Sequence, residues 1–294
     1  MSEAVPAPQP AKSASSSLGP RLVTGIIGAA VAVTLILSVP PAVGFVIWFA
    51  VFAWAAAEFV HLARNLAPTA PLGGLGVWIP AAAFAGFFLV RPPGYSGDAA
   101  ALLAAAFAAV AVASLSCLMA SENMRDAAVG MGLTAFAVPY FAVPALALYR
   151  LHLVDRWVVF LLLAIVALGD SAAYFVGRSF GRHKLAPLIS PKKTWEGSVG
   201  GFLAAVIATA IWSQWRLGEV RADLLALAAV TAVAAQLGDL VESAFKRGAG
   251  VKDSSHILPG HGGFYDRMDA MILAAPTFTL GLWLIGFERV LAGG

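Results

Sequence analysis

The chain has 294 residues, of which 60% are apolar and only 12% are charged, and its mean hydropathy is +0.83. A soluble globular domain needs far more charge on its surface, so this composition excludes that class and indicates an integral membrane protein. The formal net charge is +3 at pH 7, and we expect no nucleic-acid partner. Cys117 is the only cysteine, which excludes an intrachain disulfide and a thiolate metal cluster, and we interpret it as a small buried side chain.

The first twenty residues are rich in Pro, Ala and Ser and predict a disordered tail rather than a secretory signal. Beyond them, windows of about 20 mostly apolar residues predict membrane-spanning helices. Because these windows have helix length and no period-2 alternation, we expect an all-α, polytopic membrane bundle of about nine transmembrane helices. The predicted spans are 22–39, 42–63, 72–90, 99–120, 127–148, 157–177, 197–215, 222–245 and 267–287.

Lysine and arginine are distributed unevenly between the two ends of these spans. With the N-terminus inside, thirteen of them lie on the cytoplasmic side and six on the opposite side, which predicts a cytoplasmic N-terminus. Nine of the thirteen belong to the loops after the sixth and eighth spans. Two spans separate those loops, so they face the same side in either orientation, and one aqueous site can draw on both.

The first polar block covers residues 169–201. Asp170 falls inside the sixth span, where insertion of a charge costs about 2.5–3.5 kcal/mol, so it must face protein, water or a cation. A polar contact that packs two helices together is the simpler alternative. In "SPKKTWEG", residues 190–197, Lys192 and Lys193 present two positive charges just before a glycine-rich helix start. Contact with anionic lipid head groups would also explain these lysines.

The second polar block covers residues 236–269. Asp239, Glu242, Ser243 and Lys246 are spaced by three and four residues, so they form one stripe at the end of the eighth span. This stripe is polar where lipid would require apolar side chains. It therefore predicts contact with protein, water or a ligand.

A glycine-rich loop, "GAGVKDSSHILPGHGG", follows this stripe, and its glycines allow several backbone N–H groups to turn toward one point, as in sites for phosphate. Asp266, Arg267 and Asp269 then open the ninth span. Complementarity to the helix dipole could explain Asp269 alone but not the whole group. Clustered acids with lysine and arginine, and no Cys or multi-His set, predict a hard oxygen site suited to Mg²⁺ and substrate phosphates.

Other site chemistries fit the sequence less well. His256 and His261 have no cysteine or carboxylate partner at zinc spacing, which argues against zinc. His261 is instead interpreted as a donor to a phosphate or as a residue that organises the loop. The chain contains no Walker A pattern, and no GxSxG or GxGxxG pattern lies at a predicted strand-to-helix turn, so phosphate handling must come from the loop itself.

The run "SAFKRGAGVKDSSHILPGHGGFYDRMD", residues 243–269, resembles the C-terminal signature of phosphatidate cytidylyltransferases, also called CDP-diacylglycerol synthases. Asp170 and "SPKKTWEG" are similar to the other polar segment of that family, and the resemblance covers about residues 130–290. It implies a reaction of CTP with phosphatidic acid that yields CDP-diacylglycerol and pyrophosphate. It also implies a site that opens both to lipid and to the cytosol, and a dependence on Mg²⁺, with a second, monovalent cation left open.

The resemblance assigns Asp239 and Asp266 to the metal centre. We expect catalytic roles for Asp239, Asp266, Lys246, Arg247, Lys252 and Arg267, and substrate binding by Ser190, Lys192, Lys193, Thr194, Asp253, His261, Gly262, Gly263 and Asp269. We divide the chain into a tail (1–20), N-terminal transmembrane helices (21–150) and a C-terminal transmembrane catalytic region (151–294). The expected location is a bacterial inner membrane with a cytoplasmic active site, and a homodimer is left open.

Two other functions stay open. An ion-coupled carrier could use Asp170 and Asp239 as a cation path, although it would not need the glycine-rich loop. A CTP-dependent lipid kinase, or cytidylyl transfer to an isoprenoid-type lipid phosphate, would keep the nucleotide and change the reaction or the acceptor. The products formed from CTP and phosphatidic acid distinguish all three.

Overall fold

The computed structural model describes residues 34, 37–72, 79, 81–82, 98–255, 257 and 262–287. This part of the chain forms seven helices and one two-stranded hairpin. Five of the helices (α2, α5, α6, α7 and α8) are long and apolar enough to cross a membrane. In chain order the elements are α2 (Pro41–Leu66), α4 (Asp98–Met119), α5 (Met124–Val154), α6 (Arg156–Phe180), β1 (Lys184–Ala186), β2 (Ser190–Thr194), α7 (Trp195–Leu217), α8 (Ala222–Gly248) and α9 (Tyr265–Leu284).

Helices are present at seven of the nine predicted windows, and five of these seven are long and apolar enough to cross a membrane. The windows 22–39 and 72–90 lie mostly outside the described residues, so the count of nine is not confirmed. Helices α2, α5, α6 and α7 run past both ends of their predicted windows, and α5 has 31 residues. The reason is that an apolar window marks the part of a helix that lipid can cover, whereas the hydrogen-bonded helix continues into the polar segments beside it.

The hairpin departs from the all-helical prediction. The segment "SPKKT" forms β2, which pairs antiparallel with β1, and Lys184 lies opposite Thr194. The two ends of the hairpin are held together because Trp195 N–H donates to the His183 carbonyl at 3.0 Å and His183 Nδ1 lies 2.6 Å from Glu196 Oε1. Strands of three and five residues are too short to give the alternating pattern that sequence analysis relies on.

Side-chain caps fix the ends of the helices that carry the site. The Thr194 hydroxyl accepts the N–H of Gly197 at 3.1 Å, so α7 begins directly after β2. At the start of α6, the Asp155 carboxylate accepts the N–H of Trp157 at 2.9 Å. Each cap pairs one of the N–H groups that the first turn of a helix leaves without a partner, and the Thr194 cap also sets where α7 follows the hairpin.

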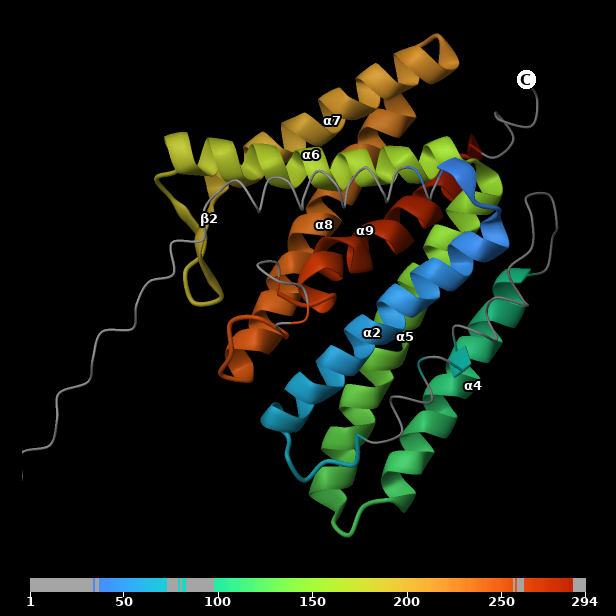
Figure 1. Cartoon of the computed structure of the whole chain (residues 1–294), viewed down its shortest axis with the longest axis vertical. Helices are drawn as coiled ribbons and strands as arrows, with labels where there is room; N and C mark the ends of the chain where they lie inside the picture. The colour runs from blue at the N-terminus through green and yellow to red at the C-terminus, as the bar shows by residue number, and fades with distance from the viewer. Residues whose placement is uncertain are drawn as a thin grey trace, which may run out of the picture.

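The helices are arranged in three groups that contact one another (Figure 1). Helices α2, α4 and α5 lie together, α6 packs along α7, and α8 packs along α9. Helix α8 also contacts α7, and α9 contacts α5 and α2, so α8 and α9 join the other two groups. The hairpin extends from the end of α6 toward the C-terminal end of α8.

An aromatic cluster fills the space where α2, α5, α8 and α9 meet. The ring of Phe59 lies 5.0 Å from Phe245 and 6.0 Å from Tyr265, both in edge-to-face geometry, and 5.4 Å from Phe141. Tyr265, Phe59 and Phe141 are fully buried. Edge-to-face ring pairs add about 0.5–1.5 kcal/mol each beyond simple burial, so this cluster gives a rigid base for the start of α9.

Candidate active site

The polar stripe predicted on α8 is present in the structure. The Ser243 hydroxyl donates to Asp239 Oδ1 at 3.3 Å, and Lys246 Nζ lies 2.7 Å from Glu242 Oε1. Glu242 is fully buried, and Lys246 is largely buried beside it. A buried carboxylate needs a partner of opposite charge, so this part of α8 is a polar surface inside the bundle rather than a lipid-facing one.

Helix α9 brings another acid to this stripe. A Cβ on Gly238 would lie 2.4 Å from the Asp269 carbonyl, so only glycine lets α8 and α9 approach this closely. As a result, Asp239, Glu242 and Asp269 each offer a carboxylate oxygen, and these oxygens lie within 4.8 Å of one another. Three hard oxygen donors at this spacing suit a magnesium ion better than a thiolate-preferring metal.

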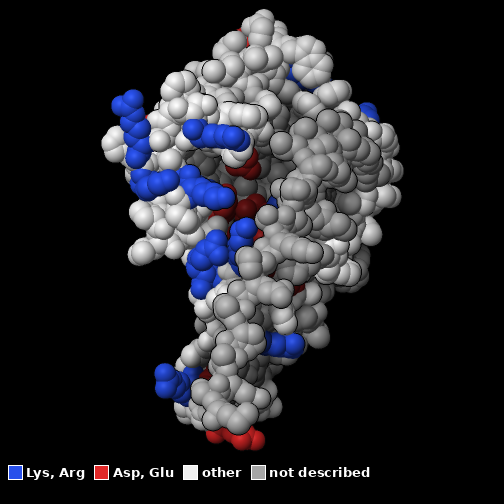
Figure 2. All heavy atoms as spheres, turned by 60° about the vertical axis from the view of Figure 1, so that its left-hand side comes forward, with Lys and Arg blue, Asp and Glu red and all other residues white. Residues whose placement is uncertain are grey.

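Asp170 on α6 belongs to the same acidic region. Its charge interacts with Asp239 and with Asp269, so acids from three helices lie close together. Figure 2 shows a hollow on this side of the molecule with acidic side chains in its depth and basic side chains around it. Asp170 is an exposed residue of α6, and its charge also interacts with those of Lys193 and Arg267. We therefore favour a role for Asp170 in a polar site over a simple contact that packs two helices together.

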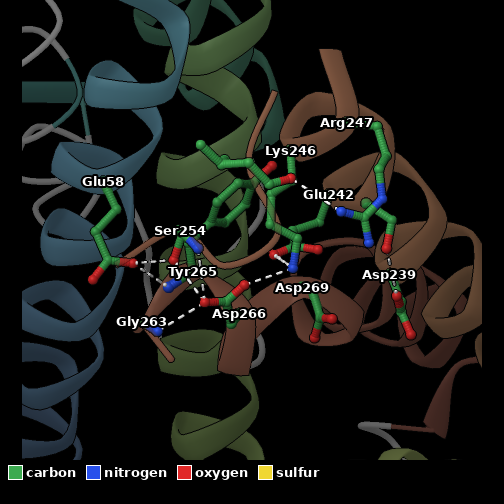
Figure 3. A network of polar contacts seen from close by, with 12 residues as sticks. Glu58, Asp239, Glu242, Lys246, Arg247, Ser254, Gly263, Tyr265, Asp266 and Asp269 are labelled. Atoms are coloured by element: carbon green, nitrogen blue, oxygen red, sulfur yellow. Dashed lines mark hydrogen bonds and ion pairs between the residues drawn. The ribbon is translucent and has the colours of Figure 1, made fainter. Parts of the chain in front are cut away.

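Two lysines neutralise part of this acidic charge. Lys193 Nζ, from β2, lies 2.6 Å from Asp239 Oδ2. Lys246 Nζ lies between Glu242 and Asp266, 2.6 Å from Asp266 Oδ1 (Figure 3). The two predicted polar blocks therefore meet in one site. This agrees with the sequence-based expectation that the loops after the sixth and eighth spans face the same side.

Asp266 is held by the loop that precedes α9. Its Oδ2 accepts the N–H of Ser254 at 2.9 Å and the N–H of Gly263 at 2.8 Å, while Oδ1 faces Lys246 (Figure 3). Asp266 thus lies next to the group formed by Asp239, Glu242 and Asp269 and is linked to it through Lys246.

The sequence predicts that the glycine-rich segment turns its backbone N–H groups toward a substrate phosphate, and this stays a prediction. In the described part of this loop, the N–H groups of Ser254, Gly263, Phe264 and Tyr265 donate to carboxylates of the chain itself. The physical reason is that a carboxylate of the protein is always present and satisfies buried N–H groups as well as a phosphate would.

The remaining predicted residues surround this centre. Arg247 Nε donates to the Ile189 carbonyl at 3.4 Å, which joins α8 to the hairpin loop, and its Nη1 donates to the Val251 carbonyl at 3.0 Å. The Thr194 hydroxyl caps α7, so that position already has a structural role. Lys192, Arg247, Lys252, Asp253 and Arg267 are exposed, Ser190 and Gly262 are half-buried, and His261 lies outside the described residues.

Glu58 on α2 was not predicted by sequence reasoning. It is buried, with 5% of its surface exposed, and it accepts hydrogen bonds from the loop before α9. The signal that would have found it is the one that identified Asp170, namely an acid inside an apolar window. Glu58 lies close to the end of its window, where a charge is usually interpreted as a contact with water or lipid head groups.

A family model described as "Cytidylyltransferase family" matches residues 20–285 of the chain, which includes every element of this site. The chain belongs to the cytidylyltransferase family. The acids and lysines described above all fall within the matched residues.

Curated relatives in this family are named phosphatidate cytidylyltransferase. The chain is 44% identical to the one from Haemophilus influenzae over 128 residues, 41% of this chain and 44% of the relative. It is 43% identical to that of Pseudomonas aeruginosa over 132 residues (43% and 49%) and 37% identical to that of Mycobacterium leprae over 155 residues (53% and 49%). The chain therefore spans a little under half of the length of these relatives.

Proposed function

We propose that this chain transfers the cytidylyl group of CTP to phosphatidic acid and so forms CDP-diacylglycerol and pyrophosphate. The observation that carries the proposal is the acidic group on α8 and α9, with lysines from α8 and β2 beside it, inside a bundle of apolar helices. Family membership and the names of the curated relatives support the same reaction.

The donor set fits a divalent cation, because oxygens from three carboxylates lie within 4.8 Å of one another. Asp239, with Glu242 and Asp269, would hold Mg²⁺, and Asp266 is the further ligand that the sequence predicts. When bound, Mg²⁺ would neutralise charge on the triphosphate. Lys246 contacts Asp266 Oδ1. If Asp266 used this oxygen to bind the cation, the ammonium group of Lys246 would be free to contact a phosphate of CTP.

The reaction needs positioning more than it needs a base. A phosphate oxygen of phosphatidic acid is already anionic near pH 7, so it can attack the α-phosphorus of CTP directly. The new P–O bond forms as the bond between the α-phosphorus and the bridging oxygen breaks, and pyrophosphate leaves with that electron pair. Lys193, Lys246, Arg247 and Arg267 would hold the phosphates in line, and Lys252 is a further candidate for this role.

We also propose that the protein is a multi-pass protein of a bacterial inner membrane whose site faces the cytosol, where CTP is found. The Lys and Arg distribution supports this orientation. Because Cys117 is buried, single cysteines introduced at Lys184 and Glu219 can report it in intact cells. A membrane-impermeant maleimide should label position 219 and leave position 184 unlabelled, and the reverse pattern would refute the orientation.

The proposed reaction is tested by its products. Purified protein is incubated with radiolabelled CTP, Mg²⁺ and phosphatidic acid in mixed micelles. We expect CDP-diacylglycerol and pyrophosphate in equal amounts. Release of CDP would indicate a lipid kinase, and preference for a polyprenyl phosphate would change the acceptor. Absence of any product from CTP would overturn the proposal.

A further inference from the structure

Glu58 makes four hydrogen bonds, and all four donors belong to residues 254–265. Its Oε1 accepts the Ser255 hydroxyl at 2.7 Å and the Phe264 N–H at 3.2 Å. Its Oε2 accepts the Ser254 hydroxyl at 2.7 Å and the Tyr265 N–H at 2.9 Å (Figure 3). Each carboxylate oxygen thus accepts one hydroxyl and one backbone N–H. These bonds hold residues 254–255 and 264–265, at the two ends of the loop, against Glu58 of α2.

The same loop segments hold Asp266. Ser254 N–H and Gly263 N–H both donate to Asp266 Oδ2. The Ser254 hydroxyl also lies 2.9 Å from this oxygen, although its single proton can be donated to only one carboxylate at a time. Glu58 and Asp266 are therefore the two carboxylates that hold the described ends of this loop, and any shift of these ends moves the donors that orient Asp266.

Glycine at position 263 is a further sign that this arrangement is tightly fixed. A Cβ there would lie 2.2 Å from Glu58 Oε2 and 2.2 Å from the Ser254 hydroxyl. The carboxylate occupies the space that a side chain at position 263 would need.

We infer that Glu58, on α2, is a positioning residue for the reaction proposed above: it fixes the loop before α9 so that Asp266 faces Lys246 and the acids of α8. This inference rests on the proposed function for its effect on catalysis, but its structural part does not. It gives the N-terminal half of the chain a direct part in the site, 208 residues upstream of Asp266 in the sequence.

Glu58→Gln is the most informative change because it keeps the shape of the side chain. The new amide group can donate to a serine hydroxyl but cannot accept an N–H, so one of the Phe264 and Tyr265 N–H groups loses its acceptor. Helix α2 should stay in place, because the ring of Trp54 lies 5.9 Å from Phe264 and Phe59 packs edge-to-face on Tyr265. Glu122→Gln, the same substitution at an exposed position, is the matched control.

The first measurement is hydrogen–deuterium exchange of the full-length protein in detergent without substrates. We expect faster exchange in Glu58→Gln for peptides that cover residues 252–265, no change in the aromatic core of α5, and no change anywhere in Glu122→Gln. Unchanged exchange in this loop would overturn the inference, whatever the activity of the protein.

The second measurement is steady-state kinetics with CTP and phosphatidic acid. We expect the kcat of Glu58→Gln to fall by about 10- to 100-fold, the loss that follows when reacting groups are misplaced by about 1 Å. Glu58→Asp keeps the charge, so its kcat should lie between those of Glu58→Gln and the wild type. In the double variant Ser255→Ala with Glu58→Gln, the fold-decrease in kcat should be smaller than the product of the two single decreases. A faster-exchanging loop with unchanged kcat would overturn the positioning role. An inactive wild-type protein would remove the proposed function instead, and exchange alone would then decide whether Glu58 holds the loop.

Discussion

The ammonium group of Lys193 lies 2.6 Å from Oδ2 of Asp239, and this contact joins the hairpin between α6 and α7 to the acidic surface of α8. Only 25% of the lysine side chain and 29% of the aspartate side chain are exposed. A divalent cation bound by Asp239 would share this carboxylate with Lys193, and the two positive charges would repel each other. We therefore expect Lys193 and the cation to compete for Asp239, and a bound cation would leave the lysine free to contact a phosphate.

This competition predicts opposite effects of Lys193→Gln on metal affinity and on turnover. We expect the Mg²⁺ concentration for half-maximal activity to fall by up to about fivefold, the equivalent of the roughly 1 kcal/mol that a partly exposed ion pair contributes. At saturating Mg²⁺ the kcat should be lower than in the wild type, because a phosphate contact is lost. Lys192→Gln, at the exposed neighbouring position, serves as the control and should leave the Mg²⁺ titration unchanged. An identical shift in both variants would show that general charge, not the contact with Asp239, is responsible.

Asp239→Asn should separate catalysis from folding. The substitution keeps the shape of the side chain but removes the charge that a divalent cation and Lys193 both need, so we expect turnover to fall by at least about 100-fold. Thermal stability without metal should be kept or rise, because a charge in a membrane-spanning helix opposes insertion and the pair with Lys193 contributes roughly 1 kcal/mol or less. The stabilising effect of Mg²⁺ on thermal unfolding should disappear.

The matched control for this experiment is Asp223→Asn. It is the same substitution on the same helix, and Asp223 is also ion-paired, with Arg221 at the opposite end of α8. We expect it to keep normal turnover and a normal Mg²⁺ response. An Asp239→Asn protein that still responds to Mg²⁺ as the wild type does would remove Asp239 from the metal centre.

The parts of the site that were predictable are those encoded within one helix. The stripe of Asp239, Glu242 and Lys246 follows from helical spacing alone, and so does the common face of Asp266 and Asp269. Even so, spacing alone assigns Glu242 no role at the site, and only the approach of α9 shows that its oxygen lies near those of two other acids. The strength of a local pattern does not reveal which helix will cover it.

Contacts between distant segments were not predictable in the same way. Glu58 and Ser254 are 196 positions apart, and no periodicity relates them. The hairpin is a similar case, because strands of three and five residues are stabilised by their surroundings rather than by their own sequence pattern. In the glycine-rich loop, the glycines indicate only that the backbone can turn and not which anion its N–H groups meet; in the described part these groups meet the Glu58 and Asp266 carboxylates.

Lys246 should be essential for folding as well as for catalysis. Its ammonium group contacts Glu242 and Asp266, whose side chains are only 1% and 6% exposed. Lys246→Met leaves both carboxylates without this partner, and loss of one partner of a buried pair costs about 3–5 kcal/mol. We expect a large decrease in the unfolding temperature of the detergent-solubilised protein together with loss of activity.

The double variant Lys246→Met with Glu242→Gln tests the cause of this instability. The second change removes the buried charge that the first leaves unpaired, so stability should recover while activity does not. If stability does not recover, the decrease comes from lost packing of the lysine side chain rather than from the unpaired Glu242 carboxylate.

Two glycines with nearly the same backbone conformation allow a final test of the loop. Gly262 has φ of 75° and Gly250 has φ of 72°, in the left-handed region where alanine costs about 1–2 kcal/mol at either position. They differ in their surroundings, because a Cβ on Gly262 would lie 2.5 Å from Asp266 Oδ2, whereas a Cβ on Gly250 would meet nothing within 4 Å. We therefore expect similar backbone strain in Gly262→Ala and Gly250→Ala but loss of turnover only in Gly262→Ala, because only there must the Asp266 carboxylate move.

Steady-state kinetics and thermal unfolding of the two proteins, measured side by side, provide the comparison. Equal turnover in the two variants would mean that the position of the Asp266 carboxylate does not limit the reaction.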